Sequence, residues 1–185
     1  MHSVKLQALS RVKVNLYLHI IGKRADGYHN LDSLVAFPEI GDEILVSPSN
    51  SINLKITGKS KKELNEKENL ILKAIKLLKN RKMGADIHLI KDTPISAGLG
   101  GGSSDASFTL IMLNKLFHLN LTQKQLQGYA KKLGSDCPFF IGNSTSLVTG
   151  VGDNFTEIDL DLTKYEIKLY DLGIHVSTKE AYSKI

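Results

Sequence analysis

The feature that most limits what this chain can fold into is a run of glycines near its middle. Four of the five residues 98–102 are glycine, and two serines follow directly. The segment before them, residues 86–91, has the length of a short strand, and apolar residues recur at helical spacing from Ser103 onward. A glycine loop between a strand and a helix binds phosphate, because the bare backbone can turn its N–H groups toward an anion at the positive end of the helix.

Two familiar kinds of phosphate loop do not fit this run. A Walker loop requires a lysine after its last glycine, and here Gly102 is followed by Ser103. The dinucleotide pattern G-x-G-x-x-G, started at Gly98, has Ser103 in its sixth position and lies far from the first strand. A tight turn that only packs a helix on a sheet would not need four glycines beside two serines. We therefore predict a phosphate loop that has no lysine of its own.

If the phosphate is to be transferred, the cation and the proton acceptor must come from elsewhere in the chain. Apolar and polar residues alternate over residues 12–20, which predicts a strand with one apolar face and with Lys13 and Asn15 on the opposite side. Asp136 lies just before Pro138, in a connection that we expect to approach the glycine loop. Taken singly, Lys13 and Asp136 are better explained as an exposed strand lysine and a turn aspartate.

The remaining elements are predicted from periodicity and from capping residues. Helices are expected from Asn69 to Gly84, from Ser103 onward, and from the capping box of Thr122 and Gln125 to Gly134. Residues 135–138 are expected to form a tight connection. Further strands are expected at residues 31–37, 43–46, 52–56, 146–149 and 167–170. A second capping box, Ser177 with Glu180, predicts a helix that the chain end cuts to about two turns.

Composition narrows the function classes. The 185 residues are 42% hydrophobic and 23% charged, which is typical of a globular α/β protein and argues against disorder. The net charge of +5 suits anionic partners, but the basic run at residues 59–62 lacks the interleaved aromatic residues of a single-strand nucleic-acid binder. Cys137 is the only cysteine, so we expect a cytosolic protein with a buried structural thiol there and not a nucleophile. No apolar stretch approaches the ~20 residues of a membrane span.

Four blocks of the chain resemble a known family. In order they read VKVNLYLHIIGKRADGYHNL, PISAGLGGGSSDAS, GSDCPFF and GIHVSTKEAY, and they resemble the 4-diphosphocytidyl-2-C-methyl-D-erythritol kinases of the GHMP kinase superfamily. The glycine loop occurs across the superfamily, whereas RADGYHNL is more specific to these kinases. The resemblance implies an α+β fold, with a mixed sheet like that of the second domain of ribosomal protein S5, helices packed on one side and a left-handed β-α-β crossover. It also implies an ATP-binding N-terminal domain over residues 1–165 and the start of a truncated second domain over residues 166–185.

The resemblance also implies a cytoplasmic enzyme that uses ATP, with Mg2+, to phosphorylate a hydroxyl of a cytidine-diphosphate-linked methylerythritol in non-mevalonate isoprenoid biosynthesis. It implies no nucleic-acid or membrane partner, and it identifies neither metal ligands nor an oligomeric state. Lys13 and Asp136 match the catalytic pair, in which Asp136 accepts the hydroxyl proton and Lys13 keeps that carboxylate ionised. The matching ATP-binding positions are Pro94, Ile95, Ser96, Ala97, Gly98, Leu99, Gly100, Gly101, Gly102, Ser103, Ser104, Asn69, Leu70 and Lys91. The matching substrate-binding positions are Asn15, Tyr28, His29, Thr178 and Tyr182.

Two alternatives stay open at this point: a GHMP kinase for another small alcohol, and a truncated, non-catalytic module that binds a nucleotide or RNA. The chain also departs from the family pattern at Ser107, where a second alanine is common, and at residues 171–173, which lack a frequent proline. Because family members carry a further α/β domain, we expect the 185 residues alone to show weak turnover or none.

Overall fold

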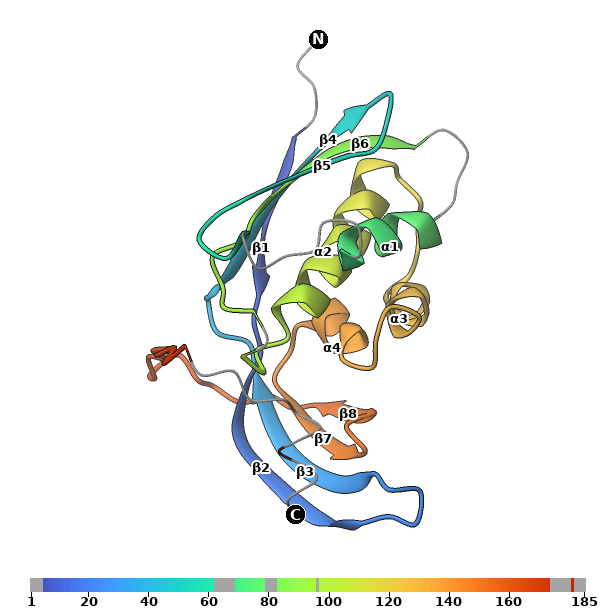
Figure 1. Ribbon diagram of the computed structural model, residues 1–185. Helices are drawn as coiled ribbons and strands as arrows, with labels where there is room; N and C mark the ends of the chain where they lie inside the picture. The colour runs from blue at the N-terminus through green and yellow to red at the C-terminus, as the bar shows by residue number, and fades with distance from the viewer. Residues whose placement is uncertain (1–4, 62–68, 79–82, 96, 174–180, 182–185) are drawn as a thin grey trace.

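The computed structural model describes residues 5–61, 69–78, 83–95, 97–173 and 181, and its strands form two four-stranded sheets (Figure 1). The first sheet has the order β1-β4-β6-β5, made of β1 (Leu6–Arg11), β4 (Gly41–Ser49), β6 (Gly84–Ile90) and β5 (Asn53–Thr57). Its strands are antiparallel except for β5 and β6, which are parallel, so this is a mixed sheet as predicted. The crossover between β5 and β6 contains α1 (Leu70–Leu77).

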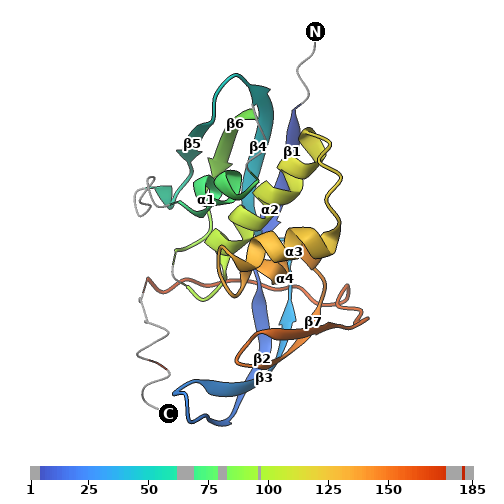
Figure 2. The same cartoon turned by 90° about the vertical axis from the view of Figure 1, so that its right-hand side faces the viewer.

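The second sheet is antiparallel throughout and has the order β2-β3-β7-β8. It consists of β2 (Val14–Lys23), β3 (His29–Ala36), β7 (Ser146–Gly150) and β8 (Asn154–Glu157). It lies at one end of the molecule, beyond the helices (Figure 2). The chain crosses from the first sheet to the second at Val12 and Lys13, between β1 and β2. Lys13 and Asn15 therefore lie at the junction of the two sheets, whereas Tyr28 and His29 lie in the turn after β2 and at the start of β3.

Helices α1, α2 (Gly101–Leu116), α3 (Gln123–Lys131) and α4 (Cys137–Gly142) lie on the same side of the first sheet, which confirms the predicted arrangement. The main core fills the space between this sheet and α1 and α2, and its fully buried apolar side chains include Ile44, Val46, Ile56, Ile71, Ile87, Leu89, Leu110 and Leu113. Helix α2 runs through this layer, so it also buries polar residues, Ser104, Asp105, Ser107 and Thr109 among them. None of the helices in the described ranges is long and apolar enough to cross a membrane.

Two of the three predicted helix starts are confirmed by their caps. The Asn69 Oδ1 atom accepts a hydrogen bond of 2.8 Å from the N–H of Ile71 at the start of α1. The side chains of Thr122 and Gln125 form the predicted capping box at the start of α3. Helix α2 begins two residues before Ser103, after Gly100 in a left-handed conformation with φ of +67°.

The prediction of one regular strand over residues 12–20 is wrong in part. Val12 and Lys13 belong to neither strand, β2 begins at Val14, and its pairing with β3 is shifted between Asn15 and Tyr17 and again between Ile20 and Gly22. Leu16, which the first shift leaves unpaired, and Leu18 are 43% and 45% exposed. The alternation is present in the sequence, but it does not describe a single buried face.

Other differences concern elements that pattern alone did not indicate. The predictions missed β1 and β8. Residues 135–138, predicted as a tight connection, lead into α4, whose first turn accommodates Pro138. Residues 167–170, predicted as a strand, form neither helix nor strand. The capping box of Ser177 and Glu180 lies outside the described residues.

Candidate active site

A cavity of about 970 Å³ lies where the second sheet meets the glycine loop and α4. Its walls come from three blocks of sequence that are far apart in the chain. Six of the predicted site residues line it together, namely Lys13, Asn15, Tyr28, His29, Gly98 and Asp136. The remaining walls are largely apolar and include Phe139, Phe140, Val148 and Val151. A large, mostly apolar cavity with a few convergent polar groups is typical of a small-molecule site.

Lys13 is held at this junction by hydrogen bonds at both its backbone and its side chain. Its N–H donates to the carbonyl oxygen of Leu99 in the glycine loop at 2.9 Å, and its Nζ donates to Asn15 Oδ1 at 3.1 Å. The Asn15 Nδ2 atom donates to Ser33 Oγ at 2.7 Å, and that hydroxyl donates to the carbonyl oxygen of Tyr17 at 2.6 Å. Lys13 and Asn15 therefore point to the same side, as predicted, and the chain of bonds continues into β3.

Asp136 occupies the position before the first residue of α4 and is half-buried. Its Oδ1 atom accepts a long hydrogen bond of 3.4 Å from Ser135 Oγ. No ion pair within the described ranges joins Asp136 to Lys13, although both line the same cavity. The direct pairing that the resemblance suggested is thus not a feature of this structure, in which the ammonium group of Lys13 bonds to Asn15.

The glycine loop packs closely against both of these elements. A Cβ atom added at Gly100 would lie 2.7 Å from Phe140 Cζ of α4 and 3.4 Å from Lys13 Cγ. Gly98 also has a positive φ, of +73°, whereas the space beside Gly98 and Gly102 is open. Position 100 therefore requires glycine for two reasons: its φ is positive, and a Cβ atom would collide with Phe140. The open side of the loop is where an anion can approach the backbone.

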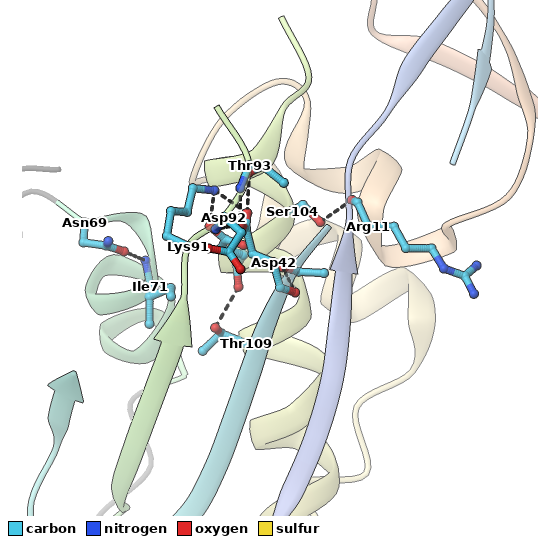
Figure 3. Close-up of polar contacts among 11 residues, drawn as sticks. Arg11, Asp42, Asn69, Ile71, Lys91, Asp92, Thr93, Ser104 and Thr109 are labelled. Carbon is cyan, nitrogen blue, oxygen red and sulfur yellow. Dashed lines mark hydrogen bonds and ion pairs between the residues drawn. The ribbon is translucent and has the colours of Figure 1, made fainter. Parts of the chain in front are cut away.

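Beneath the loop lies a buried polar cluster, which we call the loop-base cluster and define as Ser10, Asp42, Lys91, Thr93 and Asp105. Figure 3 shows Asp42, Lys91 and Thr93 of this cluster with their polar contacts. The Nζ atom of Lys91 lies 2.5 Å from Asp42 Oδ2 and 2.8 Å from Asp105 Oδ2. Thr93 Oγ1 donates to Asp42 Oδ2 at 2.6 Å, and Ser10 Oγ lies 2.6 Å from Asp105 Oδ1. These bonds join β1, β4, the end of β6 and the first turns of α2.

The charges in the loop-base cluster shift one another's protonation. Burial raises the pKa of Asp105 to about 6 even though the Lys91 ammonium opposes the rise, and the negative charge of Asp42 adds to it. Burial alone would lower the pKa of Lys91, but the two carboxylates outweigh it and raise that pKa above its ordinary value. The cluster is therefore one strongly coupled group of charges in the protein interior.

The position of Lys91 does not support its predicted role as an ATP-binding residue. Its side chain is 2% exposed, and its ammonium group is already bonded to two carboxylates. Sequence reasoning missed Asp42 and Asp105 altogether. One signal was available, because Asp105 stands among small residues directly after the glycines and serines, where a charged side chain on the buried face of a helix would need a partner.

The other predicted residues are placed as follows. Ser104 is buried, and its hydroxyl donates to the carbonyl oxygen of Arg11 at 2.6 Å, so that group faces β1 and not the open side of the loop. Tyr28 is 65% exposed, whereas His29 is buried. Asn69 caps α1, and Leu70 is the first residue of that helix. Ser96, Thr178 and Tyr182 lie outside the described residues. The half-buried positions are Pro94, Ile95, Leu99 and Ser103, and Ala97 is exposed.

Residues 69–144, which span α1 to α4, match the protein family described as the GHMP kinases N terminal domain. A protein of Azobacteroides pseudotrichonymphae genomovar. CFP2 named 4-diphosphocytidyl-2-C-methyl-D-erythritol kinase is 44% identical over 180 residues, covering 96% of this chain and 67% of that protein. The chain belongs to the 4-diphosphocytidyl-2-C-methyl-D-erythritol kinase family. A protein of the same name from Bacteroides thetaiotaomicron is 42% identical over 184 residues, covering 94% of this chain and 65% of the relative. The chain thus spans about two thirds of the length of these relatives.

A solved structure of the same family supports the assignment. The crystal structure of a 4-(cytidine 5'-diphospho)-2C-methyl-D-erythritol kinase superposes with a TM-score of 0.71 at 34% identity, covering 84% of this chain and 56% of that one. A homoserine kinase from Cytophaga hutchinsonii superposes with a TM-score of 0.62 over 97% of this chain and 59% of its own, but at only 16% identity. The second match shows that the fold is shared, and the first agrees with the family shown by the more similar relatives.

Proposed function

We propose that this protein transfers a phosphoryl group from ATP to a hydroxyl of 4-diphosphocytidyl-2-C-methyl-D-erythritol in isoprenoid precursor biosynthesis, in the cytoplasm. The observation that carries the proposal is the shared cavity. It places Lys13, Asp136 and the glycine loop near one another, and it also contains Tyr28 and His29 of the block most specific to this family. The names of the relatives supply the substrate class.

The proposed chemistry needs little from the protein beyond positioning and charge, since phosphoryl transfer is mostly a matter of alignment and electrostatic stabilisation. Asp136 would accept the proton of the attacking hydroxyl. Lys13 would stabilise the negative charge on the phosphoryl group during its transfer. The Oδ1 atom of Asn15 accepts a hydrogen bond from the Lys13 ammonium group and so holds it in position. The backbone N–H groups of the glycine loop and the N-terminus of α2 would hold the ATP phosphates, because that end of the helix is positive.

Magnesium is proposed on the chemistry of ATP. No group of three His, Cys, Asp or Glu side chains suited to a metal lies within the described residues. Mg2+ commonly keeps several waters and takes most of its protein-bound contacts from substrate phosphates and one or two carboxylates, so no larger protein cage is required. The carboxylate that we propose as a ligand is Asp136, because it lines the same cavity as Gly98 of the glycine loop. When bound, the ion would neutralise charge on the phosphates.

We place the cytidine group at the other end of the cavity, beside the turn between β2 and β3. His29 offers a hydrogen-bond donor and an acceptor for the edge of a base, and the exposed ring of Tyr28 offers a surface for stacking. Asn15, Thr178 and Tyr182 complete the proposed substrate contacts on the strength of the family resemblance. The reacting hydroxyl would then lie toward Lys13 and Asp136.

Phosphate transfer from ATP to the cytidine-linked acceptor tests the proposal directly. Asp136→Asn keeps the shape of the side chain but removes the proton acceptor, so kcat is expected to fall by roughly 100-fold or more while the acceptor still binds. Asp86→Asn is a matched control, because Asp86 bonds Asn53 on β5 and lines a different cavity. An unchanged rate in Asp136→Asn would remove that residue from the proposed role, and transfer to homoserine in preference to the cytidine-linked acceptor would overturn the proposed substrate.

A further inference from the structure

Asp42 is the hub of the loop-base cluster. Each of its two carboxylate oxygens accepts two hydrogen bonds, and the side chain is fully buried. The Oδ1 atom accepts from the N–H groups of Asp92 and Thr93 at 2.7 and 2.8 Å. The Oδ2 atom accepts from Lys91 Nζ at 2.5 Å and from Thr93 Oγ1 at 2.6 Å. One carboxylate on β4 thereby fixes both the backbone and the side chain of Thr93, the residue directly before Pro94, where the glycine loop begins.

The same cluster touches the far end of the glycine loop. A Cβ atom added at Gly101 would lie 2.8 Å from Lys91 Nζ, 2.9 Å from Thr93 Oγ1 and 3.6 Å from Asp42 Oδ2. Lys91 also bonds Asp105, one turn further along α2. The entry of the loop and the helix that follows it are therefore tied to the same buried charges. This arrangement lies on the inner side of the loop, away from the cavity, since none of its members lines that cavity.

We infer that Asp42 and Thr93 are positioning residues for the nucleotide, which hold the glycine loop in the shape that receives phosphate without touching the ligand themselves. The inference rests on the proposed binding of ATP by this loop. A glycine-rich segment has more conformational freedom to lose than any other, and a loop fixed before binding avoids that cost when the ligand arrives. Buried, charge-assisted hydrogen bonds suit this task, because they have narrow geometry and are costly to leave unmade.

Thr93 offers a matched pair of variants that separates positioning from general packing. Thr93→Val keeps the volume and removes the hydroxyl that bonds Asp42, while Thr93→Ser keeps the hydroxyl and removes a methyl group. Two ligands probe the two ends of the proposed site, a non-hydrolysable ATP analogue with an imido bridge for the loop and cytidine 5'-diphosphate for the β2–β3 end. Their dissociation constants are measured by titration calorimetry for the wild-type protein and both variants, with the Tm recorded for each.

We expect Thr93→Val to weaken the ATP analogue by about tenfold, the equivalent of about 1.4 kcal/mol. Thr93→Ser should stay within about twofold of the wild type, since it retains the bond to Asp42. The affinity for cytidine 5'-diphosphate should be the same in all three proteins, because its end of the cavity is built on the other sheet.

Three results would count against the inference. An ATP affinity in Thr93→Val equal to that of the wild type would overturn it and leave the proposed function standing. A parallel loss of affinity for both ligands in Thr93→Val, together with a large fall in Tm, would show a general structural role and overturn it as well. A wild-type protein that binds cytidine 5'-diphosphate but not the ATP analogue would overturn the proposed function along with it.

Discussion

At Gly101 the backbone of α2 passes so near the buried ammonium group of Lys91 that an added Cβ atom would lie 2.8 Å from it. Its neighbours in the loop are glycines for other reasons: Gly100 has a positive φ and packs on Phe140, while Gly102 borders open space. The three consecutive glycines 100–102 therefore occupy positions with different structural requirements. At the scale of single residues, the pattern predicted that the loop binds phosphate, but it could not show which glycine serves the ligand and which serves the protein interior.

Gly101→Ala tests the interior constraint. The new Cβ atom would lie within 3.0 Å of both Lys91 Nζ and Thr93 Oγ1, and these atoms are held by their bonds to Asp42. We expect the free energy of unfolding to fall by roughly 1–3 kcal/mol, as for other overpacked cores, and the affinity for ATP to fall with it. Urea unfolding and nucleotide titration measure the two effects.

The matched control for this substitution is Gly128→Ala in α3. Nothing lies within 4 Å of a Cβ atom placed there, and the residue is exposed in the middle of a helix. Alanine is the better helix former by up to about 1 kcal/mol, so this variant should be as stable as the wild type or slightly more so. If Gly101→Ala were as stable to unfolding as Gly128→Ala, the close approach at Gly101 would contribute nothing to the free energy of unfolding.

At the scale of elements, prediction succeeded where the signal is local and failed where it depends on partners. The capping box of α3 and the cap of α1 need only residues within one turn of each other, and both were predicted. The bulges of β2 arise from its pairing with β3, and the bond between Lys91 and Asp42 joins residues 49 positions apart. No periodicity in a single segment contains that information. The six residues of α4 are too few to show a helical repeat.

The cap of α3 provides a test at this scale. Thr122 Oγ1 accepts from the N–H of Gln125, and the Gln125 side chain accepts from the N–H of Thr122 at 2.9 Å. Thr122→Ala removes the first bond and is expected to lower the free energy of unfolding by about 1 kcal/mol, whereas Thr122→Ser should retain nearly all of it. Because α3 contributes no residue to the cavity, ligand affinities should not change in either variant. Equal stability of the alanine and serine variants would contradict the assigned cap.

At the scale of the whole molecule, the site exists only because distant segments meet. The cavity combines the crossing between the sheets, the turn after β2, the glycine loop and the start of α4. Sequence reasoning named residues from all four regions, but it took the family resemblance, not spacing, to connect Lys13 with Asp136. It missed the apolar walls such as Phe139 and Val148, because their contribution depends on how the second sheet lies against α4.

The stability of the whole fold should respond to pH through Asp105. Its pKa is about 6 in the folded protein against an ordinary value of 3.8, so the folded state holds a proton that the unfolded state releases between these two values. Stability contributed by this proton is present at low pH and is lost as the pH rises toward and through 6. Lowering the pH from 7.5 to 5 should therefore stabilise the wild type by about 1 kcal/mol relative to Asp105→Asn.

Chemical unfolding of both proteins at the two pH values measures this difference. The groups that face Asp105 are Lys91, Asp42 and the hydroxyl of Ser10. Asp105→Asn retains all three and removes only the carboxyl group, so the difference reports the loss of that group from the coupled cluster. Parallel pH profiles in the two proteins would show that Asp105 is ionised throughout the range.

The hydrogen bond from the backbone N–H of Lys13 to the carbonyl oxygen of Leu99 allows movement of the glycine loop to be followed by hydrogen exchange. The amide proton of Lys13 is protected by a carbonyl group of the glycine loop, and not by a strand partner, so it can exchange with solvent only when the loop moves away. Its exchange rate thus records the opening of the loop at a single labelled position, with no substitution and no added dye. A nucleotide that closes the loop would slow the exchange of that one proton.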